Sequence, residues 1–266
     1  MEVIQSIKKE KGTGYLLTTK SGIKMQVSED SLVKHRLLKG SEVSKELLKQ
    51  VKEEASFDIG NQKALNYLSY QLRSEKEIKD YLKKQEIPFQ QIAQIIDKLR
   101  ELSLLDDKIF AESYVRTAIR TTDKGPQGVK EFLMKKGVVQ AVIEEALTLF
   151  DTAHQKELGQ KLVDKMARKY QQKSQKERIN KIRQQLFMKG FHSDVIAVLM
   201  DELAFEDNDE EDEYDLLVKQ GDKLWRRHER LENRKKHQKI KQSLYQKGFS
   251  IDDINRYIEE KEMELE

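Results

Sequence analysis

Two adjacent carboxylates, Asp106 and Asp107, are the residues of this chain whose type and spacing best suit a divalent metal or an acid–base pair. Neighbouring side chains on a helix point about 100° apart, and the pair follows Leu104 and Leu105 where a helix is expected to begin. The free amides and the dipole of a helix N-terminus favour negative charge at such a position. We therefore interpret the two aspartates as a helix cap rather than as a catalytic dyad.

Other catalytic chemistry finds less support. The five histidines are scattered along the chain and form no H-E-x-x-H motif, and no G-x-x-x-x-G-K-[ST] phosphate loop is present. The absence of Cys excludes disulfides, thiol catalysis and Cys-ligated metal sites. We expect a protein that is not an enzyme and that needs neither a metal nor another cofactor.

The distribution of charge is more informative than its total. The chain has 50 Lys and Arg against 47 Asp and Glu, for a net charge of +3. Residues 215–249 nevertheless hold 11 basic and 4 acidic side chains, and residues 206–214 hold 7 acidic and no basic ones. A local excess of positive charge suits a phosphate backbone or an acidic protein surface. We interpret the acidic tract as a mobile linker between repeats 3 and 4, and the alternative is that it masks the basic residues within the same molecule.

These charges lie on a repeated helical pattern. In four segments an Ile or Val precedes a Leu by four residues, and an apolar residue follows the Leu by five, after a Gly in three of the segments. The segments start at Ile78, Val129, Ile182 and Ile240, at offsets of 51, 53 and 58 residues. This pattern predicts a helix with one buried stripe that ends at a left-handed Gly.

Apolar periodicity before and after each segment predicts two more helices, and hence a three-helix repeat that is present four times. The first helices are expected near 62–72, 107–121, 155–171 and 214–231. Leu82, Leu133, Leu186 and Leu244 are expected to hold the repeats together, and most aromatic rings, Phe187 and Tyr245 among them, to pack in the core.

Residues 1–27 differ, because three short alternating or β-branched runs are separated by turn residues at 12–14 and 20–22. They predict a small antiparallel meander, followed by helices near 28–36 and 44–57.

Only 37% of the residues are hydrophobic, too few for one compact domain of 266 residues. We predict a mainly α protein: a β-meander and helix module, then an elongated, curved array of four repeats. The predicted segments are 1–60 (module), 61–105, 106–150, 151–205 (repeats 1 to 3), 206–214 (acidic linker) and 215–266 (repeat 4).

Four aligned basic residues, Lys79, Lys130, Arg183 and Lys241, each follow the buried Ile or Val directly. They suggest a recurrent positive strip, although a merely solvated helix face is an equally open interpretation. The candidate residues for binding a partner or nucleic acid are Arg73, Lys79, Lys130, Lys135, Lys136, Arg178, Lys181, Arg183, Lys189, Arg226, Arg227, Arg230, Lys236, Lys239 and Lys241.

The segments R-S-x-x-E-I-x-x-Y-L (residues 73–82), L-L-D-D-x-x-F-A (104–111) and K-G-P (124–126) occur together in this order. In this combination they closely resemble the RecX family. The resemblance implies tandem three-helix repeats that bind the RecA filament along its groove and inhibit strand exchange and ATP hydrolysis. It also implies filament disassembly, DNA binding, and regulation of DNA repair and the SOS response.

We accordingly expect the RecA filament as the partner, with weak, non-specific binding to single- and double-stranded DNA. The longest apolar run, the six residues 195–200, is far too short to span a membrane. No signal peptide is evident, so we expect a cytoplasmic protein. We also expect it to be a monomer. An alternative is a DNA-binding regulator that acts without RecA and uses two helices of a repeat as a helix-turn-helix.

Overall fold

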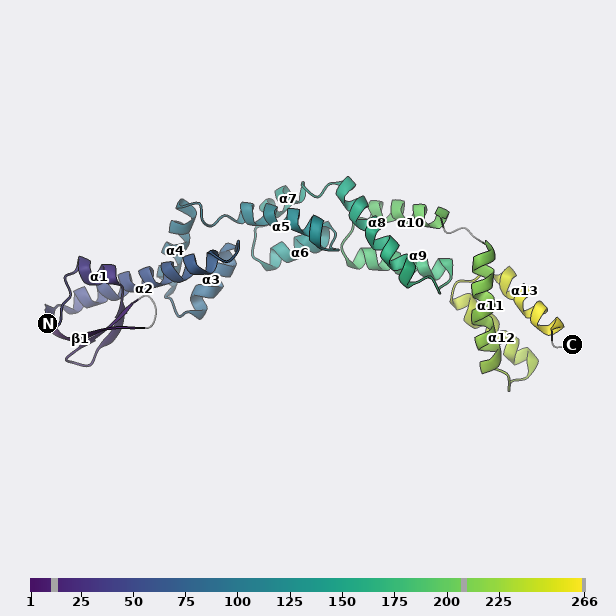
Figure 1. Ribbon diagram of the computed structural model, residues 1–266, viewed down its shortest axis with the longest axis horizontal. Coiled ribbons are helices and arrows are strands. Elements are labelled where there is room, and N and C mark those ends of the chain that lie inside the picture. The colour runs from purple at the N-terminus through teal and green to yellow at the C-terminus, as the bar shows by residue number, and fades with distance from the viewer. Residues whose placement is uncertain (11–13, 207–209, 265–266) are drawn as a thin grey trace. The chain divides into compact units, whose positions relative to one another are not determined.

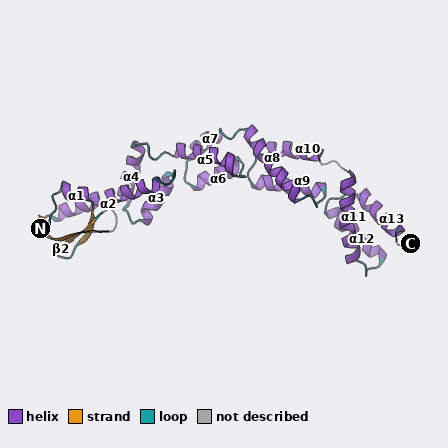
Figure 2. Ribbon diagram, viewed as in Figure 1, coloured by secondary structure: helices purple, strands orange, loops and turns teal. Residues whose placement is uncertain are grey.

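The structure, a computed structural model, describes residues 1–10, 14–206 and 210–264. They fall into two compact units, residues 1–114 with 132–146 and residues 115–131 with 147–266. Figure 2 shows strands near the N-terminus and helices in the rest of the described chain. The predicted mainly α fold with a small β-containing module is thus confirmed.

The N-terminal sheet is antiparallel, with the strand order β3-β2-β1-β4. Its strands are β1 (Glu2–Lys9), β2 (Tyr15–Thr19), β3 (Lys24–Val27) and β4 (Glu42–Val43). The predicted meander is present, and β4 is an additional edge strand whose two residues carry no recognisable pattern. The turn at 20–22 is also present, with Gly22 at a φ of 89°. The turn predicted over 12–14 falls largely outside the described residues.

Two helices complete the module, and the second is longer than predicted. Helix α1 (Glu29–Lys34) is capped by Ser28, and α2 (Lys45–Leu68) by Ser44. The separate helices predicted near 44–57 and 62–72 are one helix, so the predicted boundary between residues 60 and 61 lies inside α2. Gly60 does not break this helix. A Cβ at Gly60 would lie 2.6 Å from Ile95 Cδ1, so the glycine permits close packing of α2 on α4 (Phe89–Glu101).

Four three-helix repeats follow one another along the described chain, from blue to yellow in Figure 1. Repeat 1 consists of the end of α2, α3 (Glu75–Lys84) and α4; repeat 2 of α5 (Asp107–Thr121), α6 (Pro126–Lys135) and α7 (Gln140–Leu147); repeat 3 of α8 (Thr152–Lys169), α9 (Gln175–Met188) and α10 (Ser193–Glu206); and repeat 4 of α11 (Glu210–Arg227), α12 (Asn233–Gln246) and α13 (Ile251–Met263). The other predicted boundaries, and the elongated, curved course of the array, stay predictions.

The acidic tract is largely helical. Residues 210–214 belong to α11 rather than to a linker, and residues 207–209 lie outside the described residues.

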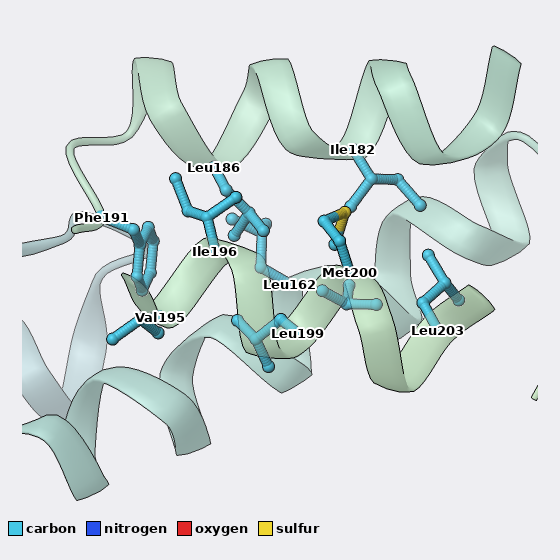
Figure 3. Packing of buried hydrophobic residues seen from close by; sticks show 10 residues of the cluster. Leu162, Ile182, Leu186, Phe191, Val195, Ile196, Leu199, Met200 and Leu203 are labelled. Carbon is cyan, nitrogen blue, oxygen red and sulfur yellow. The ribbon is translucent and has the colours of Figure 1, made fainter. Parts of the chain in front are cut away.

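Repeats 1, 3 and 4 each have a hydrophobic core of their own. Figure 3 shows the core of repeat 3, where Leu162 of α8, Leu186 of α9 and Leu199 of α10 meet. Leu82 and Leu244 take the place of Leu186 in the cores of repeats 1 and 4, and all three side chains are fully buried. These leucines therefore stabilise the inside of a repeat, and the expectation that they join neighbouring repeats is wrong.

The second helix of every repeat ends in the predicted reversal. Gly137, Gly190 and Gly248 have φ values of 81°, 84° and 97°, and Glu86 takes the same left-handed conformation in repeat 1, with a φ of 60°. In each case the amide of the next residue donates to the carbonyl of the buried Leu, as from Phe191 N to Leu186 O at 3.2 Å. This C-terminal motif fixes the direction in which the third helix begins.

Candidate partner and nucleic-acid interface

The aspartate pair is structural, as predicted. Asp106 Oδ1 accepts hydrogen bonds from the amides of Lys108 at 2.7 Å and Ile109 at 3.3 Å, and so caps α5. Asp107 Oδ1 accepts a hydrogen bond from the amide of Glu75 at 2.9 Å, at the start of α3. Burial raises the pKa of Asp107. No cluster of His, Asp and Glu that could hold a metal ion occurs among the described residues.

Repeats 1 and 2 are joined by polar contacts that the sequence pattern did not reveal. The fully buried Ser74 caps α3, and its Oγ also donates to the carbonyl of Lys136 at 2.7 Å. Lys136 Nζ in turn lies 2.5 Å from Glu77 Oε1, and the stem of Lys76 covers Gly137. The N-terminus of α3 therefore docks on the C-terminal turn of α6.

Repeats 3 and 4 repeat this arrangement. The fully buried Ser174 caps α9, and its Oγ donates to the carbonyl of Lys247. The amide of Gln175 donates to the carboxylate of Glu213 at 3.1 Å, as that of Glu75 does to Asp107. The stem of Lys176 covers Gly248. One serine thus has two roles at both junctions, since it caps its own helix and binds the next repeat.

Backbone hydrogen bonds join repeats 2 and 3. The amide of Gly125 donates to Lys189 O at 2.8 Å, and that of Gln127 to Gly190 O at 3.0 Å. A Cβ at Gly125 would lie 2.5 Å from Gly190 O, so a side chain there would force the two backbones apart. Lys189 Nζ adds an ion pair with Asp123 at 2.7 Å. The K-G-P motif is therefore a joint between repeats.

Of the four aligned cations, Arg183 is exposed, and Lys130 and Lys241 are partly exposed. Lys79 has an exposed side chain that pairs with Glu75 at 3.2 Å on its own helix. In the described part of the chain, neither Arg183 nor Lys241 forms an ion pair with a carboxylate. The position directly after the buried Ile or Val therefore presents positive charge to solvent in repeats 1, 3 and 4.

Two predicted binding residues are largely buried, and we correct their assignment. The guanidinium of Arg73 lies 4.1 Å from the ring centroid of Tyr67, and its side chain is only 16% exposed. Lys236 is 7% exposed, with its ammonium 4.0 Å from the ring centroid of Trp225. Both cations stack on aromatic rings of their own repeat and hold the packing together.

The other candidates differ in exposure. Lys136 and Lys189 take part in the junctions described above, while Arg178 and Lys181 are partly exposed at the N-terminal half of α9. The exposed cations that remain are Lys135 at the end of α6, Arg226 and Arg227 at the end of α11, Arg230 in the following turn, and Lys239 on α12.

A polar groove lies between α11 and the turn that joins α8 to α9, and its cationic lining was not predicted as one site. Lys173, Lys219 and Lys223 line it together with Arg226 and Lys247. Burial, and next the nearby charge of Lys173, lowers the pKa of Lys247, and Arg227 and Lys223 act in the same direction. The groove therefore contains an excess of positive charge, although Asp212, Glu213, Asp215 and Asp222 also line it.

The prediction that the aromatic rings pack in the core is wrong for three of them. Tyr67 and Tyr81 stack at 4.2 Å, as do Tyr114 and Phe132 at 4.0 Å, and these rings do belong to the packing. Tyr70, Phe187 and Tyr245 are instead 84%, 73% and 63% exposed. The exposure of Phe187 and Tyr245 could have been predicted from the sequence. Each directly follows a buried Leu, and successive side chains on a helix point about 100° apart.

Three family models match the chain. The model described as "RecX, first three-helix domain" matches residues 62–99, and that of the second three-helix domain matches residues 106–147. The model of the third three-helix domain matches residues 210–258. Among the described residues, no helix combines the length and apolar character that a membrane span requires.

Named relatives match nearly the whole chain. The regulatory protein RecX of Enterococcus faecalis is 48% identical over 264 residues, which are 99% of both chains. That of Levilactobacillus brevis is 42% identical over 97% of both chains. A crystal structure of regulatory protein RecX aligns with a TM-score of 0.61 and 33% identity over 76% of this chain and all of the other. RecX from Lactobacillus salivarius aligns with a TM-score of 0.54 and 44% identity over 56% of this chain and 97% of the other.

Proposed function

The chain belongs to the RecX family, and on that premise we propose that it regulates recombination by binding the RecA filament on single-stranded DNA. Binding inhibits strand exchange and ATP hydrolysis and shifts the balance of filament assembly, and through it DNA repair and the SOS response. The protein acts as a monomer in the cytoplasm, without a cofactor and without catalysing a reaction. It binds single- and double-stranded DNA weakly and without sequence preference.

The recurrence of an exposed or partly exposed cation at one position of the repeat carries this proposal. Lys79, Arg183 and Lys241 occupy this position on α3, α9 and α12. Repeating units with one charge each suit a partner that is itself a repeating polymer, because weak contacts add through effective concentration. Dispersed cations also favour sequence-independent binding over the base readout by one recognition helix that a helix-turn-helix regulator would need.

The deciding experiment is the ATPase activity of RecA on single-stranded DNA, titrated with this protein. We expect turnover to fall as the protein approaches the RecA concentration. Undiminished turnover at a stoichiometric amount of protein would contradict the proposal.

A second experiment tests the cations themselves. We expect the triple variant Lys79→Glu, Arg183→Glu and Lys241→Glu to lose most of its inhibition, whereas Lys45→Glu, Lys49→Glu and Lys52→Glu, three exposed positions on α2, keep it. The two variants have the same net charge, so a long-range effect of charge would lower inhibition equally in both and would contradict the role of the repeat position. Circular dichroism of both variants checks that the helices are retained.

A further inference from the structure

The second helices of repeats 3 and 4 carry chemically similar side chains at four equivalent positions on one side of the helix. Asn180, Arg183, Gln184 and Phe187 on α9 correspond to Gln238, Lys241, Gln242 and Tyr245 on α12. The spacing i, i+3, i+4 and i+7 places each set on one side of its helix. We call these residues the amide–cation–aromatic stripes.

The aromatic residue of each stripe is not required by the core. Leu186 and Leu244 occupy the buried positions and are fully buried, while Phe187 is 73% and Tyr245 63% exposed. One exposed ring is ordinary, but two at the same repeat position, each four residues after a cation, form a pattern. Neither ring stacks on another ring or lies beneath a cation among the described residues.

The two stripes are connected by a groove between α9 and α12. Tyr245 and the following turn at Gln246–Gly248 form one wall, and Lys176, Asn180, Lys181 and Gln184 lie along the other. The volume of the groove is about 350 Å³, within the range of small-molecule sites. Because Ser174 binds the carbonyl of Lys247, the two walls are held by the joint between repeats 3 and 4.

The charges that line this groove select an anion. Lys176 and Lys181 contribute two cations against one carboxylate, Glu177, and Lys247, whose ammonium donates to Gln220 Oε1 at 2.7 Å, also lines the groove. That carboxylate already lies 3.1 Å from Lys173 Nζ and 3.7 Å from Lys181 Nζ. Arg183 extends the positive charge along α9 toward Phe187, which lies about 16 Å from Lys176 at 1.5 Å per residue.

We propose that this groove and the α9 stripe bind single-stranded nucleic acid. A base stacks on Tyr245 and another on Phe187, the amides of Asn180 and Gln184 bind base edges, and Lys176, Lys181 and Arg183 contact the phosphates. Aromatic rings beside a row of cations are the common means of binding single strands without sequence preference. The inference rests on the proposed function, in that it assigns the DNA contact of the same basic face to repeats 3 and 4.

The test is the affinity of the full chain for a fluorescent oligothymidylate, measured by anisotropy. We expect Tyr245→Ala and Phe187→Ala each to weaken binding about tenfold or more. The Tyr245→Trp variant keeps an aromatic ring and should bind with the affinity of the natural chain. Phe89→Ala, at a ring that is 75% exposed in repeat 1, is the matched control and leaves binding unchanged. We also expect the fluorescence of Tyr245→Trp to be quenched by the oligonucleotide more than that of the natural chain. Wild-type affinity of both alanine variants, or a Tyr245→Trp variant whose emission does not respond, would overturn the proposal.

Two further arms separate this site from its alternatives. Binding of a DNA duplex must depend less on Tyr245 than binding of the single strand, since paired bases cannot stack on the ring. If polyglutamate competes with the oligonucleotide as well as unlabelled DNA does, the site is an acidic-peptide site and the inference is wrong. RecA ATPase is measured in parallel. If the wild-type chain inhibits RecA but the two alanine variants bind DNA as the wild type does, the site is wrong and the proposed function stands. If the alanine variants bind DNA more weakly but the wild-type chain does not inhibit RecA, the proposed function is wrong and the site stands.

Discussion

At the scale of single residues, Gly125 and Gly190 bring the backbones of repeats 2 and 3 into direct contact. We expect Gly125→Ala to destabilise the protein by about 1–3 kcal/mol, because its Cβ would lie 2.5 Å from Gly190 O and the backbone must move. Urea unfolding measures the loss. The control is Gly14→Ala, whose Cβ would lie at an ordinary 3.5 Å from Val27 O, with an expected change below about 1 kcal/mol. Equal losses in the two variants would show that Gly125 has no special place in the joint.

Glu54 gives the N-terminal module a dependence on pH. A hydrogen bond with His35 at 2.7 Å, and next one from Lys34 at 2.9 Å, lower the pKa of Glu54 from 4.5 to about 2. A carboxylate whose pKa is lower in the folded state contributes stability above its unfolded value, and this contribution disappears as the pH falls from 4.5 toward 2.

The change that tests this is Glu54→Gln. We expect the variant to have a lower melting temperature than the natural chain at pH 7, and the difference to shrink as the pH falls from 4.5 toward 2. Thermal melts followed by circular dichroism over a pH series measure it. A difference that stays constant over this window would mean that the ionised carboxylate does not stabilise the module.

How far a residue's role could be predicted depended on how near its partner lies in the sequence. Asp106 caps amides two and three residues ahead, and its role was predicted from local pattern. Asp107 binds the amide of Glu75, 32 residues away, which no local pattern reveals. Lys236 was misassigned for the same reason, since Trp225, on which it stacks, lies on another helix.

At the scale of elements, the helix caps decide both where helices begin and how repeats join. We expect Ser174→Ala to cost about 1–3 kcal/mol, because it removes the cap of α9 and leaves the carbonyl of Lys247 without its serine donor. Ser250→Ala, which removes only the cap of the terminal helix α13, should cost about 1 kcal/mol. Hydrogen exchange distinguishes the two variants, since only Ser174→Ala should speed the exchange of backbone amides at the end of α12. Unchanged exchange there would contradict the role of Ser174 in the joint.

Periodicity predicted the helices well and their ends less well. The aligned Ile, Leu and Gly positions gave the second helix of each repeat and its left-handed end, because these features lie within about ten residues of one another. The fusion of two predicted helices into α2 was missed: the helix runs on through Gly60, which lies close to Ile95 of α4. The exposed rings of the stripes were missed because helical spacing with Leu and Ile was interpreted as core packing, although Phe187 and Tyr245 each directly follow a buried Leu.

At the scale of the whole molecule, a net charge of +3 conceals how strongly binding should depend on salt. Each phosphate contact on a single strand adds about 0.7 to the slope of log affinity against log salt concentration. Neutralising two of the proposed contacts by Lys176→Gln and Arg183→Gln should therefore lower the slope by about 1.4, measured by titrating an oligothymidylate from 50 to about 200 mM salt. Lys45→Gln with Lys49→Gln changes net charge equally but lies in the N-terminal module, so its slope should equal that of the natural chain. If both double variants reduce the slope equally, affinity follows total charge, and the cations of the proposed site make no special contact with phosphate. If only the double variant in the proposed site reduces the slope, the effect of a positive charge depends on its position in the repeat.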